Sequence, residues 1–189
     1  ALLATVRSLT AERAAIAEEA MRLESLEAVL HGLTFDSVTS AVLLPPDGSP
    51  ADGRGALRVH RVLRNGRTIA AVLGVVAPDG YSGAIELLVG VRAGGEVSGV
   101  RVLSHRETPG LGDRIERRRS DWITRFEGRS LAPVDTDENH RGDWRVTRAG
   151  SGGTFDALSG ATITSRAVVD AVHRTLVDLD AREAEVFAP

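Results

Sequence analysis

The segment Asp156-Ala-Leu-Ser-Gly-Ala-Thr-Ile-Thr164 places a small, glycine-containing turn directly before a stretch with helical periodicity. The periodic apolar positions that follow it are Val168, Val169, Val172, Leu176, Val177 and Leu179. Their spacing predicts a C-terminal helix with one apolar face that packs on a core. A turn that leads into a helix N-terminus can also bind an anion, because free N–H groups and the positive end of the helix dipole point the same way.

The hydroxyl groups of this segment allow two interpretations. Ser and Thr residues that precede a helix are usually caps, and in that case the turn is ordinary loop polarity. In the other interpretation, a phosphate lies at the turn and a hydroxyl group takes part in chemistry. The local residue types alone favour capping.

The pattern Asp-x-x-Ser-Gly-Ala-Thr-x-Thr resembles the attachment signature of covalent FMN-binding domains. In that family a flavin transferase joins the phosphate of FMN to the hydroxyl of the last Thr through a phosphodiester. The resemblance implies that Thr164 carries the flavin, and that FMN is absent where the transferase is absent. The other signature positions, implied to bind the cofactor, are Asp156, Ser159, Gly160, Ala161 and Thr162.

A second segment, Ser104-His-Arg-Glu-Thr-Pro-Gly-Leu-Gly-Asp-Arg-Ile-Glu116, resembles the loop that contacts the isoalloxazine ring in the G subunits of Rnf electron-transport complexes. Residues 80–85 and 121–126 are also similar to those proteins, and the four segments occur in the family's order. The C subunit of the sodium-pumping NADH:quinone oxidoreductase shares Glu-Thr-Pro-Gly-Leu-Gly and remains an alternative. A stand-alone FMN-binding module and a simple phosphate or solute binder are further alternatives.

The Rnf resemblance implies an electron carrier within a membrane-bound, ion-translocating ferredoxin:NAD oxidoreductase. Its partners would be the other Rnf subunits and the flavin transferase. It would act as a redox subunit, with no active site beyond the flavin. The resemblance also implies a domain on the periplasmic side of the inner membrane, anchored by an N-terminal helix. Because the chain begins Ala1-Leu-Leu without a Met, we expect that anchor to have been removed.

The 107–112 loop is expected to line the flavin ring. Thr108 can hydrogen-bond the flavin edge, Leu111 can pack on the ring face, and Gly110 and Gly112 permit close backbone approach. The carboxylate of Glu107 would either disfavour the anionic reduced flavin or orient the loop.

Two aromatic residues, Tyr81 and Trp122, are possible neighbours of the flavin ring. Aromatic side chains with a polar tip pack in cores more often than they contact cofactors, provided that the tip has a hydrogen-bond partner. Core packing is therefore the favoured alternative for both residues.

Composition excludes several classes of function. The chain has 189 residues, a net charge of −3 and no cysteine. The slightly negative net charge does not indicate nucleic-acid binding. The lack of cysteine excludes disulfides and thiolate metal centres. The five His residues show no metal-ligand spacing, so no metal site is expected. We find no general acid–base pair or nucleophile–base arrangement, in agreement with an electron carrier.

The order of the predicted elements indicates an α+β fold with helices packed on an antiparallel sheet. We expect a long N-terminal helix within residues 1–35 and an FMN-binding domain over residues 36–189. Strands are predicted at 56–64, 67–77, 84–92 and 96–103. Asn65-Gly66 and Gly94-Gly95 are typical of hairpin turns, and the apolar runs 69–76 and 87–91 predict central strands covered on both faces.

Overall fold

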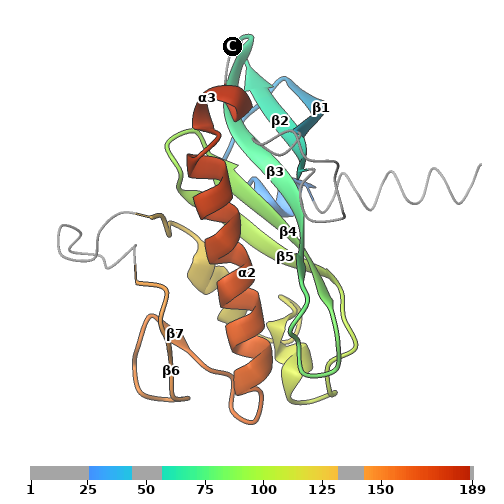
Figure 1. Ribbon diagram of the computed structural model, residues 1–189, viewed down its shortest axis with the longest axis vertical. Helices are drawn as coiled ribbons and strands as arrows, with labels where there is room; N and C mark the ends of the chain where they lie inside the picture. The colour runs from blue at the N-terminus through green and yellow to red at the C-terminus, as the bar shows by residue number, and fades with distance from the viewer. Residues whose placement is uncertain (1–25, 44–56, 132–142, 188–189) are drawn as a thin grey trace, which may run out of the picture.

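The computed structural model describes residues 26–43, 57–131 and 143–187 of the chain. They form a five-stranded antiparallel meander in the order β1-β2-β3-β4-β5 (Figure 1). The strands are β1 (Ser37–Leu43), β2 (Leu57–Arg64), β3 (Arg67–Ala77), β4 (Ile85–Arg92) and β5 (Val97–Ser104). The elements after the sheet are the 3₁₀ helices η1 (Gly112–Ile115) and η2 (Trp122–Phe126), the parallel strand pair β6 (Val146–Thr147) and β7 (Phe155–Asp156), and the helices α2 (Thr162–Asp180) and α3 (Glu183–Val186).

The predicted meander and α+β class are confirmed. Strand β3 has the predicted bounds, and the hairpin before it turns at Asn65 and Gly66 with φ of 51° and 72°. Positive φ at both central residues is what a two-residue hairpin turn requires. The 107–112 loop leads into two short 3₁₀ helices, η1 and η2, which are separated by turns.

The N-terminal region differs from the expectation in one respect. Residues 37–43 were not predicted as a strand, yet they form β1 at the sheet edge, paired along their whole length with β2. Residues 26–29 are helical, while the rest of the predicted N-terminal helix lies outside the described residues. The length of that helix and the boundary at residue 35 therefore stay predictions.

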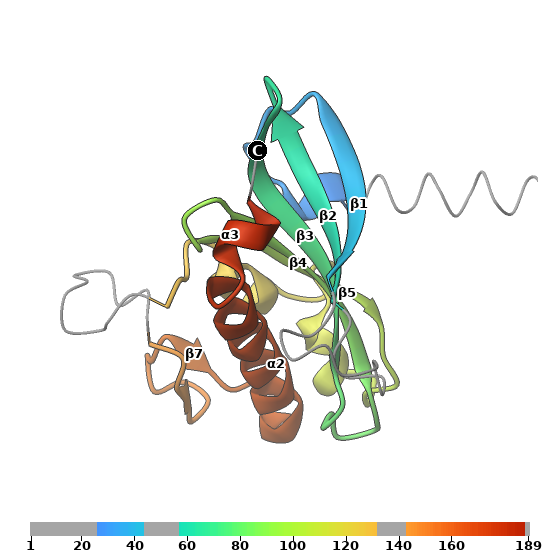
Figure 2. The same ribbon diagram turned by 45° about the horizontal axis from the view of Figure 1, so that its top comes forward.

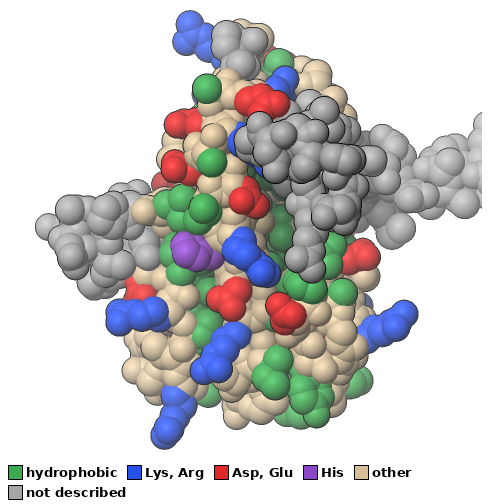
Figure 3. Space-filling view, in the orientation of Figure 1, with side chains coloured by type: hydrophobic (Ala, Val, Ile, Leu, Met, Phe, Trp, Pro, Cys, Tyr) green, Lys and Arg blue, Asp and Glu red, His purple; other side chains and the backbone are tan. Residues whose placement is uncertain are grey.

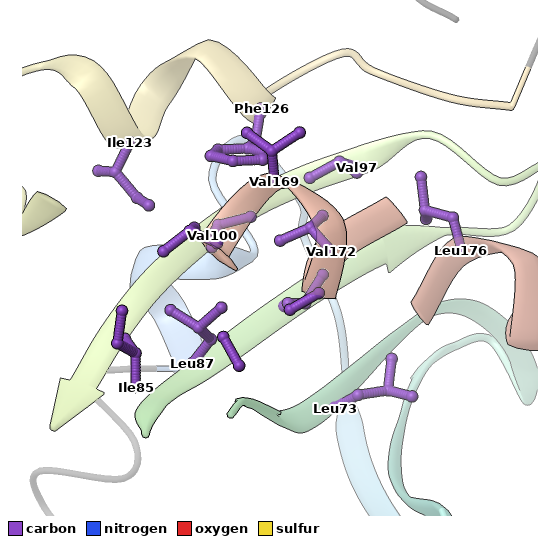
Figure 4. Packing of buried hydrophobic residues seen from close by; sticks show 14 of the residues in the cluster. Leu73, Ile85, Leu87, Val97, Val100, Ile123, Phe126, Val169, Val172 and Leu176 are labelled. Atoms are coloured by element: carbon purple, nitrogen blue, oxygen red, sulfur yellow. The ribbon is translucent and has the colours of Figure 1, made fainter. Parts of the chain in front are cut away.

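Helix α2 lies across one face of the sheet (Figures 1 and 2). Its fully buried Val169 and Val172 pack in one cluster with Leu73, Leu87 and Val100 of the strands, which Figure 4 shows from close by. Of the six apolar positions predicted to face the core, five are buried. Val177 is the exception, because 48% of it is exposed.

The opposite face of the sheet is covered in part by residues 26–35. Val29 and Leu30 are buried there against Val62, Val72 and Leu88. The Ser98 hydroxyl donates a 2.6 Å hydrogen bond to the carbonyl of Val29, which fixes this segment to β5. The expectation that the central strands are covered on both faces therefore holds for most of their length. It fails near the end of β3, where Gly74 is exposed and Val76 is 56% exposed.

An aromatic cluster joins the 143–156 segment to the rest of the domain. The ring centroids of Phe126 and Phe155 lie 4.7 Å apart, and Trp144 stacks on Phe155 at 5.5 Å and on His173 of α2 at 5.2 Å. Aromatic pairs at these separations add to the stabilisation from area burial. The cluster therefore positions β7, and with it the turn that leads into α2.

Within the part of the chain that the structure describes, no helix has the length and apolar character needed to cross a membrane.

Removing a buried side chain under α2 should destabilise the fold. Leu87→Ala is expected to lower the free energy of unfolding by about 2–5 kcal/mol, because the fully buried leucine leaves a cavity between sheet and helix. Leu103→Ala is the matched control, since Leu103 is 49% exposed on the next strand, and it should cost less than about 1 kcal/mol. Urea unfolding followed by circular dichroism measures both. Equal losses would contradict the assigned packing.

Candidate functional site

A pocket of about 510 Å³ lies where the first turn of α2 meets the loops that follow β3 and β5. It brings together most of the residues that the sequence singled out, from separate segments of the chain. Its lining residues are Tyr81, Glu107, Thr108, Leu111, Gly112, Gly160, Ala161, Thr162, Ile163 and Thr164. A volume of this size lies within the range of small-molecule sites.

The side chains of Thr164 and Glu107 meet in this pocket. Thr164 Oγ1 donates a hydrogen bond to Glu107 Oε2 at 2.5 Å, and the two residues are 1% and 5% exposed. Glu107 Oε1 accepts the backbone N–H of Ser82 at 3.0 Å. The carboxylate therefore links the first turn of α2 to the loop between β3 and β4.

Gly112 allows this close arrangement. A Cβ atom at Gly112 would lie 2.8 Å from both Cβ and Oε2 of Glu107, and 3.2 Å from Oγ1 of Thr164. Only a residue without a side chain leaves room for the two polar groups to meet.

The start of α2 does not support the capping interpretation. Its N-cap residue is Ala161, no side chain caps the helix, and its first turn contains no acidic residue. The first N–H groups of a helix have no partner within the helix, so those of the first turn of α2 are available to an anion. The turn itself is held by Ser165, whose hydroxyl accepts the N–H of Leu158 at 3.0 Å and donates to the carbonyl of Ala161 at 2.9 Å.

Local hydrogen bonds stabilise the conformation of the 107–112 loop. The carbonyl of Thr108 accepts the N–H groups of Leu111 and Gly112 at 3.2 and 3.1 Å. The N–H of Gly110 donates to Asp113, and Gly110 does not line the pocket.

His105 fixes the backbone of Glu107. Its Nδ1 accepts the N–H of Glu107 at 3.0 Å, and its Nε2 lies 2.9 Å from a carboxylate oxygen of Glu116. A hydrogen bond from Arg118, the largest cause, lowers the pKa of Glu116 to about 2. Glu116 is thus ionised at neutral pH and can accept a hydrogen bond from the Nε2–H of His105.

Three predicted residues lie on the other side of the turn. Asp156, Ser159 and Trp122 line a second depression of about 440 Å³ and not the pocket that contains Thr164. Trp122 is 5% exposed, and its Nε1 donates to the carbonyl of Asp156 at 2.7 Å, so it shows the core packing with a satisfied polar tip. Tyr81 differs, since it is 68% exposed and lines the pocket.

The carboxylate of Asp156 organises the polypeptide before α2. It accepts hydrogen bonds from the Thr147 and Ser151 hydroxyls at 2.9 and 3.1 Å, and from the N–H groups of Gly152 and Gly153 at 3.1 and 3.0 Å. These donors, with Thr147 contributing most, lower the pKa of Asp156 to about 2. In the structure this signature residue holds the 147–156 loop and does not line the pocket.

Sequence reasoning missed three residues of the site: Ile163, Ser165 and His105. Ile163 lines the pocket although it lies in the helix, and Ser165 closes the turn. The sequence offered one usable signal, because a serine four residues after Ala161 can bond back to that carbonyl. Ile163 and His105 lie inside the two segments quoted above, but their residue types alone did not mark them as site residues.

Apolar side chains gather at the pocket. Six large hydrophobic residues are exposed among the described residues, and three of them, Tyr81, Leu111 and Ile163, line this pocket. Figure 3 shows hydrophobic side chains on the surface at the lower end of the molecule, where the first turn of α2 lies in Figure 1. Clustered exposed apolar residues mark ligand or partner surfaces.

Comparisons with known proteins show the family to which the chain belongs. Residues 80–177 match the family model of the FMN-binding domain. The chain is 43% identical to the G subunit of the ion-translocating oxidoreductase complex of Pseudomonas aeruginosa (strain UCBPP-PA14), over 100% of this chain and 85% of that protein. It is 52% identical to the corresponding G subunit of Escherichia coli (strain K12), over 67% of this chain and 58% of that protein.

A solved structure shares the fold. The crystal structure of the C subunit of the Na(+)-translocating NADH-quinone reductase from Parabacteroides distasonis ATCC 8503 aligns with a TM-score of 0.57 and 16% sequence identity. The alignment covers 84% of this chain and 88% of that one. At this identity the likeness is evidence for the fold alone.

The lowered pKa of Asp156 predicts a pH-dependent contribution to stability. A carboxylate with a folded pKa of about 2, against an ordinary value of 3.8, stabilises the fold above the ordinary value and loses that effect as pH falls through 2. Asp156→Asn turns an amide NH₂ toward a backbone donor and should be less stable than wild type at about pH 5. The difference in urea midpoint should shrink by about pH 2. A difference that stays constant over this range would contradict the assigned interactions.

Proposed function

We propose that this chain, which belongs to the FMN-binding domain family and to the family of G subunits of ion-translocating oxidoreductase complexes, is the FMN-bearing electron carrier of such a complex. The observation that carries the proposal is the pocket at the start of α2. The Thr164 hydroxyl, the uncapped helix turn and exposed apolar side chains meet there, within the segment that the family model matches.

The residues present fit FMN in three ways. The uncapped first turn of α2 suits a phosphate group, since its N–H groups are unpaired within the helix. Leu111, Ile163 and Tyr81 offer apolar contact area suited to a flat ring. Thr108 supplies a hydroxyl and a backbone that can hydrogen-bond a polar ring edge, as well as anchoring its own loop.

We further propose that FMN is attached covalently, through a phosphodiester to Thr164 that a flavin transferase makes. When bound, FMN supplies the electron-transfer chemistry. The chain supplies a fixed anchor, a pocket wall and donors for the remaining negative charge of the diester. A covalent bond prevents dissociation, so the ring can stay accessible at a pocket whose Tyr81 and Ile163 are more than half exposed.

The partners in this proposal are the other subunits of the complex, as the names of the relatives indicate. A membrane anchor and a position on the periplasmic side form a separate part of the proposal, resting on the Rnf resemblance. Fusion of a topology reporter to the C-terminus of the full-length protein in its host membrane would test that part independently.

Assignment to the G subunits is preferred to assignment to the C subunits of sodium-translocating quinone reductases. Identities of 43% and 52% to G subunits contrast with 16% to the C subunit of known structure. A stand-alone FMN module would need the same pocket and no redox partners. Electron exchange with purified partner subunits would distinguish a G subunit from a stand-alone FMN module, which would show none.

Intact-mass measurement tests the covalent attachment. We expect a mass increment of one FMN phosphodiester when the domain is coexpressed with a flavin transferase, and none without the transferase. Thr164→Val should abolish the increment, because the replacement keeps the shape of the buried side chain and removes the hydroxyl. Thr164→Ser is the matched control and should still be modified.

A domain that stays unmodified, while a known substrate of the same transferase is modified in parallel, would refute the attachment. Modification that persists in Thr164→Val would place it at another residue.

A further inference from the structure

The contact between Thr164 and Glu107 bears on how the covalent bond forms. Glu107 forms no ion pair with an Arg or His side chain among the residues that the structure describes. Its two oxygens are instead held by two neutral donors, the N–H of Ser82 and the hydroxyl of Thr164. The second donor is the group that the proposed function would modify.

We propose that Glu107 accepts the hydroxyl proton of Thr164 during attachment of FMN, an inference that rests on the proposed function. Thr164 Oγ1 attacks the FMN phosphorus of a flavin dinucleotide, the Oγ1–P bond forms, and the P–O bond of the pyrophosphate breaks. The departing nucleoside monophosphate keeps the bridging oxygen and its electron pair, and the proton moves to Glu107. Two negative charges on the pyrophosphate and one on Glu107 become one on the diester and two on the monophosphate.

The geometry suits this proton transfer. The 2.5 Å separation between Oγ1 and Oε2 lies at the short end of the range for a hydroxyl donating to a carboxylate. Because the hydroxyl hydrogen points at Glu107, lone pairs of Oγ1 remain for a phosphorus that approaches through the pocket. Thr164 and Glu107 both line that pocket, so the nucleophile and its proton acceptor are in place before any substrate binds.

The carboxylate is held rigidly enough for this role. His105 accepts the N–H of Glu107, Ser82 donates to the second carboxylate oxygen, and Gly112 leaves room beside the side chain. The bond to His105 fixes the backbone of Glu107, and the bond from Ser82 fixes the carboxylate itself beside Thr164. General bases are effective when such contacts fix their distance from the proton.

The same proton is needed after the reaction. An esterified Thr164 has no hydrogen, so an ionised Glu107 would present an acceptor to another acceptor, next to the negative charge of the diester. A Glu107 that keeps the proton can instead donate a hydrogen bond to the ester oxygen or to a phosphate oxygen. Glu107 would thus act twice: it accepts the proton when the phosphodiester forms, and it then stabilises the product by donating that proton in a hydrogen bond.

The test is the initial rate of flavinylation of the purified domain by purified transferase with flavin adenine dinucleotide, followed by intact mass. Glu107→Gln should lower that rate by about 100-fold or more, because the amide keeps the size of the side chain and cannot take the proton. Glu86→Gln, which changes an exposed carboxylate on β4, is the matched control and should react at the wild-type rate. Thermal unfolding followed by circular dichroism gives the temperature range in which each variant is folded, and all rates are measured within that range.

A second variant guards against a purely structural effect. Glu107→Ala leaves space beside Thr164, and added formate should restore part of the rate relative to chloride at equal ionic strength. Wild-type rates in Glu107→Gln would overturn the inference and leave the proposed function intact. Loss of reaction in both variants without rescue by formate would reduce Glu107 to a structural role. An unmodified wild-type domain would refute the proposed function itself.

Discussion

The packing of α2 across the sheet is the constraint on which the rest of the site depends. Val169, Val172 and Leu176 are buried against the strands, so the helix has one orientation on the sheet. Because a helix is stiff, its buried middle also fixes its first turn. Thr164 is thereby held over the loop that follows β5, against a residue 57 positions earlier in the chain. The packing of the hydrophobic core therefore determines where Thr164 and Glu107 lie relative to each other.

The turn before α2 separates two tasks. On one side, Asp156 gathers hydroxyl and N–H donors of the 147–153 loop, and Trp122 bonds its carbonyl. On the other side, Thr164 and its neighbours line the pocket. A single short signature therefore contains residues that maintain the backbone conformation and residues that face the pocket. This division explains why a contiguous motif lines two depressions.

Hydrophobic periodicity and turn residues predicted much of the fold. For the site, the sequence indicated which residue types could take part, but not which of them would be in contact. The apolar run of β3 and its Asn65-Gly66 turn each point to a single structure. Strand β1 was missed because an edge strand is specified by its partner more than by its own residues. Val177 was assigned to the core because periodicity does not show where an apolar face ends. The pairing of Glu107 with Thr164 depends on how α2 meets the loop after β5, which no local pattern encodes.

The near-complete burial of Thr164 has a consequence for the order of assembly. The residue is 1% exposed and borders the pocket, which is also where the ring of an attached flavin would face its redox partners. A transferase and a partner protein would then compete for one opening. On the proposed function, attachment of the flavin to Thr164 would therefore come before a partner protein docks at that opening, and a complex that formed around an unmodified domain would block the transferase.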